Sequence, residues 1–352
     1  MQHILFVDPC CPTHYDAGTF ALQGSGASES YLYTLARALA LQPGDVQVWI
    51  AQWNRQVDVL ELDGRLRIIG KATLEQLPVR PDLVVVQRLP KTFVAMREQF
   101  RQAKMVLWTH DMPHQMVLPA QLLQDERSCI VAQSRFHAYE WQVALRRAGV
   151  PFHPSQVRHI YPFIAMDMAQ PTDRAPEPTP DFNPNKLVYL MAALKGLDHV
   201  LKVFQKLRTA LAQLELHVAC PSYSVFQPLD ALKQELKAQN IYVHERSLTR
   251  SQVLQELQTS MAALHVTPHF PETFGQINVE SNMVGTPVLA GARGATPEVL
   301  FNPGVQTIED TSNVQKIYER LLQWQQGSRP WVQRKPEFTL SAVLPQWLVL
   351  AL

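Results

Sequence analysis

The stretch from residue 261 to residue 290 restricts the fold of this chain more than any other part of its sequence. An apolar run at 261–266 predicts a buried strand, and a loop that contains prolines follows it. A helix is predicted to begin near Gln276 and to end at Gly285, where a second apolar run starts. Strand, loop, helix and strand in this order form the repeating unit of a doubly wound parallel sheet.

The loop and helix of this unit also carry two carboxylates, Glu272 and, about one helical turn inside the helix, Glu280. Ligands of doubly wound sheets bind beyond the carboxyl ends of the strands, against helix N-termini with free backbone N–H groups. Gly275 lies between the two acids, where a backbone has to approach such a ligand closely. We therefore expect a ligand site here. The alternative is that both acids are solvated, one in a loop and one on a helix face.

The same alternation of strands and helices runs through most of the chain, in two series. In the N-terminal series we expect strands at 3–7, 46–50, 83–86, 105–108 and 129–132, a hairpin near 57–69, and helices from about 28, at 92–102 and at 136–147. In the C-terminal series we expect strands at 187–191, 214–219 and 241–243, and helices at 197–212, 229–238, 249–259, 314–326 and 341–352. The predicted class is α/β, with two parallel sheets.

A proline-rich segment separates the two series. Its prolines are Pro162, Pro171, Pro176, Pro178, Pro180 and Pro184, and no periodic apolar face survives among them. A chain of 352 residues with 46% hydrophobic residues is also long for one core. We predict an N-terminal domain at 1–165, a linker at 166–185 and a C-terminal domain at 186–337, with a closing helix at 338–352.

Charge and cysteine usage exclude several classes of function. A net charge of +1 gives no electrostatic footprint for nucleic acid. The four cysteines have no metal-binding spacing, no His-x-x-x-His or Cys-x-x-Cys ligand pair supports a metal, and the adjacent Cys10 and Cys11 cannot form an unstrained disulfide. The last apolar run, 342–352, is too short to span a bilayer. We expect a reduced, cytoplasmic protein without a metal, and peripheral contact with the inner face of a membrane stays open.

The motif around the two acids resembles the donor-binding motif of retaining nucleotide-sugar glycosyltransferases of GT-B fold (group 1, family 4-like). The matching residues are Pro271, Glu272, Thr273, Phe274, Gly275, Glu280, Gly285, Thr286, Pro287 and Val288. The resemblance implies two Rossmann-like domains and a C-terminal helix that crosses back to the N-terminal domain. It further implies that Glu272 contacts sugar hydroxyls and that Glu280 holds the ribose hydroxyls of the nucleotide. Backbone amides between them, at Thr273, Phe274, Gly275 and Gln276, would reach the sugar and the diphosphate.

Lys195 follows the first strand of the C-terminal series and precedes a helix. The resemblance matches it to the diphosphate-binding lysine of the family, where a point charge adds to oriented amides. Many members have an arginine a few residues earlier, but residues 190–194 contain none. We considered Arg293 and Arg246 as substitutes for it. The alternative is that Lys195 is an ordinary surface lysine.

Two further segments of the N-terminal series match the family. Gly24 and Gly26 belong to a loop that resembles its glycine-rich loop between donor phosphates and acceptor, although Ala27 replaces the usual second glycine. The resemblance implies that Gly26 offers its N–H to the donor phosphate and that Gly24 lies on the acceptor side. Ser28 or a neighbour is predicted to cap the helix that follows. His110 ends a strand at the place where a family histidine contacts the transferred sugar, and Asp111 would orient His110 or bind the acceptor. The alternatives are glycines that only make a turn and a histidine that only caps a strand.

The function that the resemblance implies is transfer of a hexose-type sugar, with retention, from a nucleotide-diphospho-sugar to a hydroxyl. The acceptor is a glycan, a lipid-linked or another molecule, in cell-surface polysaccharide or glycoconjugate synthesis. Glu272, His110 and Lys195 are the expected catalytic residues, and no cofactor or metal is expected. Two alternatives stay open, a catalytically silent glycan- or nucleotide-binding protein and a sugar-nucleotide epimerase. No Gly-x-Gly-x-x-Gly follows the first strand of either series, which argues against a dinucleotide dehydrogenase.

Overall fold

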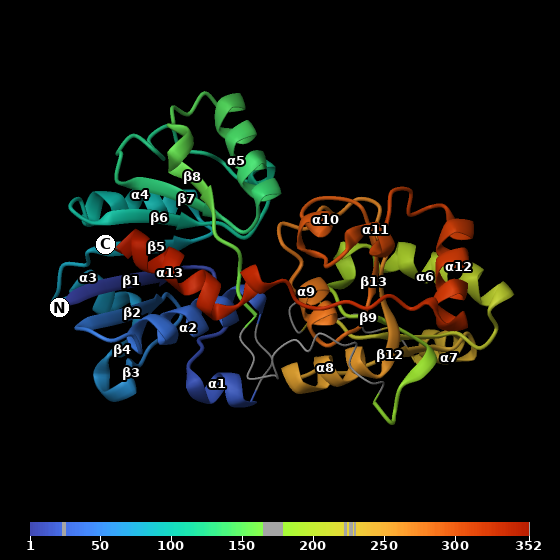
Figure 1. Cartoon of the computed structure of the whole chain (residues 1–352). Coiled ribbons are helices and arrows are strands. Elements are labelled where there is room, and N and C mark those ends of the chain that lie inside the picture. The colour runs from blue at the N-terminus through green and yellow to red at the C-terminus, as the bar shows by residue number, and fades with distance from the viewer. Residues whose placement is uncertain (23–25, 165–178, 222–223, 225–227, 229, 352) are drawn as a thin grey trace. The chain divides into compact units, whose positions relative to one another are not determined.

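The computed structural model describes residues 1–22, 26–164, 179–221, 224, 228 and 230–351 (Figure 1). The chain forms two compact units. Unit 1 comprises residues 1–165 and 337–352, and unit 2 comprises residues 166–336. Of the predicted linker at 166–185, residues 166–178 lie outside the described residues, and the first strand of unit 2 already begins at Asn183.

Unit 1 contains one sheet with the strand order β3-β4-β2-β1-β5-β6-β7-β8. All neighbouring strands are parallel except β3 and β4, which form the hairpin predicted near 57–69. The strands are β1 (Gln2–Asp8), β2 (Val46–Gln52), β3 (Val59–Glu61), β4 (Leu66–Gly70), β5 (Leu83–Gln87), β6 (Lys104–Trp108), β7 (Ser128–Ala132) and β8 (Val157–His159). The helices are α1 (Ala17–Leu22), α2 (Ala27–Ala40), α3 (Lys71–Glu75), α4 (Pro90–Gln99), α5 (Arg135–Arg147) and α13 (Leu340–Ala351), with 3₁₀ turns η1 (Leu62–Gly64), η2 (Pro113–Gln115) and η3 (Pro154–Gln156).

Helices cover both faces of this sheet, which explains the continuous apolar runs of its central strands. One face packs Leu5 and Leu107 into a core with Phe93 of α4 and Trp141 of α5. Of the predicted cap, Ser28 or a neighbour, the structure has Gly26 at the N-cap of α2, without a capping side chain, and Ser28 lies buried inside the first turn.

The C-terminal helix α13 belongs to unit 1, as the resemblance implies. Its Trp347 packs edge-on against Trp108 of β6, with ring centroids 4.8 Å apart, and contacts Phe6 of β1 at 6.5 Å. Gln2 donates a hydrogen bond to the carbonyl of Ala351. The last segment of the chain therefore completes the core around the first strand. No helix within the described residues has the length and apolar character to span a membrane.

Unit 2 contains a fully parallel sheet with the strand order β11-β10-β9-β12-β13-β14. The strands are β9 (Asn183–Tyr189), β10 (Glu215–Val218), β11 (Ile241–Val243), β12 (Ser260–His265), β13 (Val288–Gly291) and β14 (Thr307–Ile308). The helices are α6 (Leu197–Ala210), α7 (Asp230–Ala238), α8 (Arg250–Gln258), α9 (Gln276–Met283), α10 (Thr296–Val299), α11 (Pro303–Gln306) and α12 (Val314–Gln323), with the shorter turns η4 (Ala193–Lys195) and η6 (Trp324–Ser328). The turn η7 (Pro336–Phe338) begins at the last residue of unit 2, and its other two residues belong to unit 1.

The alternation of side chains along β9 divides the core of unit 2 into two layers. Leu187 and Tyr189 point to one face and pack with Phe204 of α6, whereas Val188 points to the other face and packs with Leu254 and Leu257 of α8. α8 has the predicted N-terminal cap, since Thr249 accepts from the backbone N–H of Gln252 in a capping box. The two predicted series of strands and helices thus form two doubly wound α/β units, each around one sheet.

Candidate functional site

Lys195 lies beyond the carboxyl end of β9, at the end of the turn η4. The next residue, Gly196, has φ +102° and starts α6, and a Cβ atom there would come within 3.2 Å of the Thr267 side chain. A residue with a side chain would be strained by this backbone and would also press on the loop after β12. Glycine therefore lets Lys195 and the start of α6 lie close to that loop.

The Lys195 ammonium contacts the first acid of the motif directly. Its Nζ donates to Oε1 and Oε2 of Glu272 at 2.8 and 2.9 Å and lies 4.8 Å from the centroid of the Phe270 ring. Only 9% of the Glu272 side chain and 25% of the Lys195 side chain are exposed. Glu272 is therefore not a solvated loop residue, and the structure brings these two predicted site residues together.

A glycine from a later loop fixes the backbone of Glu272. Gly294 forms a bridge with Glu272, and the carbonyl of Glu272 accepts from the N–H of Ala295 at 2.8 Å. Gly294 has φ +60°, and a Cβ atom there would lie 2.6 Å from the Glu272 carbonyl oxygen. Any other residue would push Glu272 away. Arg293, one of the two arginines considered as a substitute cation, is exposed in this same loop.

Gly275 ends the loop and serves as the N-cap of α9, with φ +81°. The helix is anchored to the sheet by Asn278, whose Oδ1 lies 2.7 Å from Nδ1 of the buried His265 on β12. Burial lowers the pKa of His265 to about 4, so its ring is neutral at physiological pH. Thr273, Phe274 and Gln276 lie on the same loop and helix start as the glycine.

The second acid, Glu280, is buried on α9 and has a partner that the sequence did not indicate. Arg250, the first residue of α8, places Nη2 2.9 Å from Glu280 Oε1, and Gln276 donates to the same oxygen. Burial raises the pKa of Glu280, while Arg250 and Gln276 act in the opposite direction. Arg246, the other arginine considered as a substitute, is exposed before α8.

A pocket of about 300 Å³ opens beside Lys195. It is lined by Leu194, Lys195, Gly196, Asp198, His199, Pro268, His269 and Phe270. The loop after β9, the first turn of α6 and the loop after β12 all contribute to it, so it lies at the carboxyl ends of two neighbouring strands. The start of α6 offers backbone N–H groups to an anion, and Lys195 adds a positive charge.

In unit 1, His110 follows β6 and is buried, with its ring 5.0 Å from that of Trp108 and its Nδ1 in contact with Nε2 of Gln133. Burial lowers the pKa of His110 well below its usual range, and the charge of Arg88 and the nearby His137 lower it further. The imidazole is therefore neutral, which is the form that both donates and accepts hydrogen bonds.

Arg88 connects the other predicted residues of unit 1 and was missed by the sequence analysis. It follows β5 with φ +63°, a backbone conformation that is rare for residues other than glycine. Its Nη2 donates to Ser28 Oγ at 2.9 Å, and its Nε lies 3.5 Å from Asp111 Oδ2. Gly26, the N-cap of α2, lies two residues before Ser28, and Gly24 lies outside the described residues. No local pattern in the sequence signals a left-handed arginine.

Comparison with known proteins shows similarity in part of the sequence and in the fold. Residues 180–331 match the family model described as glycosyl transferases group 1. No curated protein sequence matches the chain. Solved structures that resemble it include a sucrose-phosphate synthase from Thermosynechococcus elongatus, with a TM-score of 0.64, 16% identity, and coverage of 99% of this chain and 98% of that one.

Two other similar structures lead to the same fold. A UDP-forming α,α-trehalose-phosphate synthase from Burkholderia xenovorans has a TM-score of 0.65 and 12% identity, and covers 100% of this chain and 99% of its own. The catalytic domain of starch synthase IV from Arabidopsis thaliana, bound to ADP and acarbose, has a TM-score of 0.62 and 11% identity, over 99% and 98%. The predicted GT-B fold is confirmed, with two α/β units whose sheets consist of parallel strands apart from the β3–β4 hairpin.

Proposed function

We propose that this chain, a GT-B protein whose residues 180–331 form a group 1 glycosyl transferase domain, transfers a hexose-type sugar from a nucleotide-diphospho-sugar to an acceptor hydroxyl with retention. The acceptor we propose is a glycan or a lipid-linked molecule in cell-surface polysaccharide or glycoconjugate synthesis. The observation that carries the proposal is the two-oxygen contact between Lys195 and Glu272 beside a pocket at the strand ends.

This ion pair contains the two charges that such a donor requires. The Glu272 carboxylate can accept hydrogen bonds from sugar hydroxyls, and the Lys195 ammonium can neutralise a diphosphate. In the absence of a donor, the two groups neutralise each other. A donor that enters would take over both roles, because its phosphates attract Lys195 and its hydroxyls replace Lys195 on Glu272.

The proposed reaction breaks the bond between the anomeric carbon and the diphosphate oxygen. The nucleoside diphosphate leaves with the bonding electrons, and the sugar becomes oxocarbenium-like. Lys195 and the N–H groups at the start of α6 stabilise the charge that develops on the leaving oxygen. The acceptor hydroxyl attacks from the same face and gives its proton to that phosphate oxygen, so no enzyme nucleophile is needed. We propose no metal for this step, since Lys195 supplies the positive charge.

Residues around this pair would position the donor. Glu280 is suited to the two ribose hydroxyls, because Arg250 holds its carboxylate in place and leaves one oxygen without a charged partner among the described residues. The backbone from Thr273 to Gln276 would present N–H groups to the sugar and the diphosphate. His110, neutral by burial, would contact the transferred sugar. Gly26 would offer its backbone N–H to the donor phosphate, and Asp111 belongs to the acceptor side of the proposal.

A thermal-shift panel of UDP-, GDP- and ADP-hexoses tests donor binding. A ligand that binds only the folded state stabilises it by about 2.7 kcal/mol at a concentration of 100 times its Kd. We expect one nucleotide class to raise the melting temperature, and the same donor to release nucleoside diphosphate when an acceptor is added. A panel in which no nucleotide-sugar raises the melting temperature would overturn the proposal.

Two departures from the family pattern favour a second candidate, a catalytically silent binding protein. No arginine occurs at 190–194, and Ala27 stands where the family has a glycine. Binding without release of nucleoside diphosphate for any acceptor would support this candidate. An isomerised sugar nucleotide, formed without an acceptor, would instead identify an epimerase.

A further inference from the structure

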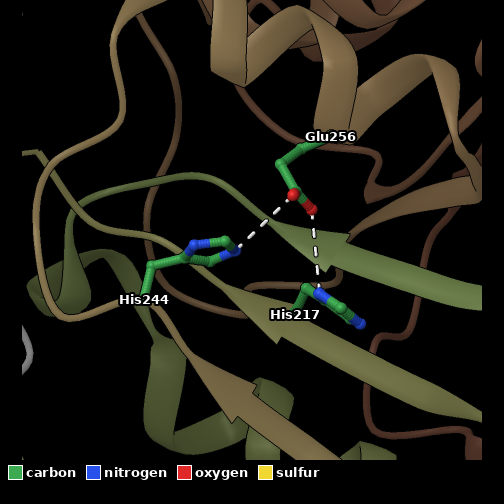
Figure 2. A group of neighbouring side chains, drawn as sticks. All are labelled: His217, His244 and Glu256. Atoms are coloured by element: carbon green, nitrogen blue, oxygen red, sulfur yellow. Dashed lines mark ion pairs between the residues drawn. The ribbon is translucent and has the colours of Figure 1, made fainter.

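A second cluster of polar side chains lies in unit 2, on the sheet face that α8 covers. It consists of His217 on β10, His244 directly after β11, and Glu256 in the last turn of α8, and Figure 2 shows the three side chains pointing toward one another. His217 Nδ1 lies 3.7 Å from Glu256 Oε2, and His244 Nε2 lies 3.7 Å from Glu256 Oε1. One ligand atom from each residue falls within 4.8 Å of the others.

The strand register explains why the two histidines meet. His217 is paired with Tyr242, and His244 follows Tyr242 by two residues. The side chains of His217, Tyr242 and His244 therefore leave the same face of the sheet. Leu254 and Leu257 anchor α8 to this face through the core around Val188, which brings Glu256 above the histidines. The cluster is therefore built by three separate elements.

Both histidine–glutamate distances exceed the range of a hydrogen bond. Zn²⁺ binds imidazole nitrogen at about 2.0–2.1 Å, which places the ligand atoms of a tetrahedral site about 3.4 Å apart. Rotations of three side chains that are 19–28% exposed would close the observed gaps. Two imidazoles and one carboxylate form a ligand set typical of zinc.

We propose that His217, His244 and Glu256 bind a divalent transition metal ion, preferably Zn²⁺. The bound ion would hold α8 against the sheet. The site is separate from Lys195 and Glu272, and its role is structural. α8 also carries Arg250, the partner of Glu280, so the metal would fix the helix that positions this arginine.

Groups around the cluster fit this role. Glu215 Oε2 lies 3.4 Å from His217 Nε2, the nitrogen that faces away from Glu256, which matches the carboxylate that usually orients a metal-binding histidine. Lys186 Nζ lies 2.8 Å from Glu256 Oε2 and donates to Thr259 Oγ1 at 2.9 Å. Lys186 thus occupies one carboxylate oxygen and leaves Oε1, the oxygen nearest His244, for the metal.

Titration of the metal-free, full-length chain with Zn²⁺ by calorimetry tests the proposal, together with thermal unfolding at each Zn²⁺ concentration. We expect one equivalent to bind and to raise the melting temperature. His217→Gln and His244→Gln should each weaken binding at least tenfold and remove most of the thermal shift. His14→Gln, which changes an exposed histidine of unit 1, is the matched control and should bind like the wild type.

Glu256→Gln also removes a ligand, but it deprives Lys186 of its partner, so the two histidine variants decide the outcome. An excess of Mg²⁺ should not displace Zn²⁺, because Mg²⁺ prefers oxygen ligands. The proposal fails if no single equivalent binds, or if the double variant His217→Gln, His244→Gln binds Zn²⁺ as the wild type does.

Discussion

Two lysine–glutamate pairs in unit 2, both at 2.8 Å, differ in what surrounds them. Lys186 lies within β9, hydrogen-bonded to Thr259, and its partner Glu256 lies on a helix. Lys195 lies beyond the carboxyl end of β9, next to Gly196, and its partner Glu272 lies in a loop beside a pocket. The first pair fastens regular elements to each other, and the second is positioned to exchange its partners for a ligand. Two ion pairs of the same residue types therefore differ in role, because one lies within the sheet and the other lies beyond the carboxyl end of the strand.

The strongest test of this contrast is the loss of each carboxylate in turn. Glu272→Gln keeps the shape of the side chain but removes the charge that would hold the sugar and balance Lys195. We expect sugar transfer to fall by about 10²–10³-fold, the effect of removing one preorganised electrostatic group. Steady-state rates of nucleoside diphosphate release measure this loss.

Glu256→Gln is the matched control for this experiment, since it changes the same residue type in the other pair. It should keep transfer within a few fold of the wild type and instead lower the melting temperature. Equal losses of activity in the two variants would contradict the distinction between the pairs.

Gly294→Ala tests how firmly the pocket-side pair is held. The new Cβ atom would lie 2.6 Å from the Glu272 carbonyl oxygen, on a backbone with φ +60°. We expect a loss of about 2–4 kcal/mol in the free energy of unfolding, because both strain and a backbone clash must be relieved. Urea unfolding measures it. Gly304→Ala, where nothing lies within 4 Å, should be neutral or slightly stabilising.

Acid should weaken the strand-side pair in a defined range of pH. The pKa of Glu256 is lowered from 4.5 to about 2, because Lys186 and His244 outweigh the effect of burial. Between these values the unfolded chain binds more protons than the folded one, so stability is present above about pH 4.5 and is lost as the pH falls through about 2. The loss amounts to about 2–3 kcal/mol.

Unfolding free energies of the wild type and Glu256→Gln, measured by urea from pH 7 to pH 2, check this expectation. The difference between the two proteins should be largest at neutral pH and should shrink toward pH 2. A difference that does not depend on pH would mean that the carboxylate charge does not stabilise unit 2.

The sequence predicted those features that local patterns encode. The apolar run at 187–191 and the cap at Thr249 are signals within a few residues. The helix has its cap at Thr249, and the strand formed but covers 183–189, so it begins four residues and ends two residues earlier than predicted. Lys195 and Glu272 are 77 residues apart, and only the family motif suggested a shared site. The position of the Arg88 side chain depends on a left-handed backbone conformation, which the residue type does not predict.

The sequence did not indicate the cluster of His217, His244 and Glu256, for a related reason. The expectation of no metal considered only ligand pairs such as His-x-x-x-His, which bind a metal from one helix. The two spacings of this kind, His110/His114 and His265/His269, each run from a strand end into the following loop and do not support a metal. His217, His244 and Glu256 come from two strand regions and a helix, and only the register of β10 with β11 aligns them. Arg250 met Glu280 in the same way, through the packing of α8. Contacts of this kind depend on tertiary structure and leave no spacing in the sequence.

A third lysine–glutamate pair gives the smallest expected effect and sets the scale for the other two. Lys233 Nζ lies 3.2 Å from Glu245 Oε1, and 75% of the Glu245 side chain is exposed. Water and salt screen such a pair, and holding two long side chains together costs entropy. Glu245→Gln should therefore change the free energy of unfolding by no more than about 0.5 kcal/mol and leave sugar transfer unchanged, by the same urea and product-release measurements. A larger loss here would show that charge alone, without burial or a pocket, accounts for the effects at Glu256 and Glu272.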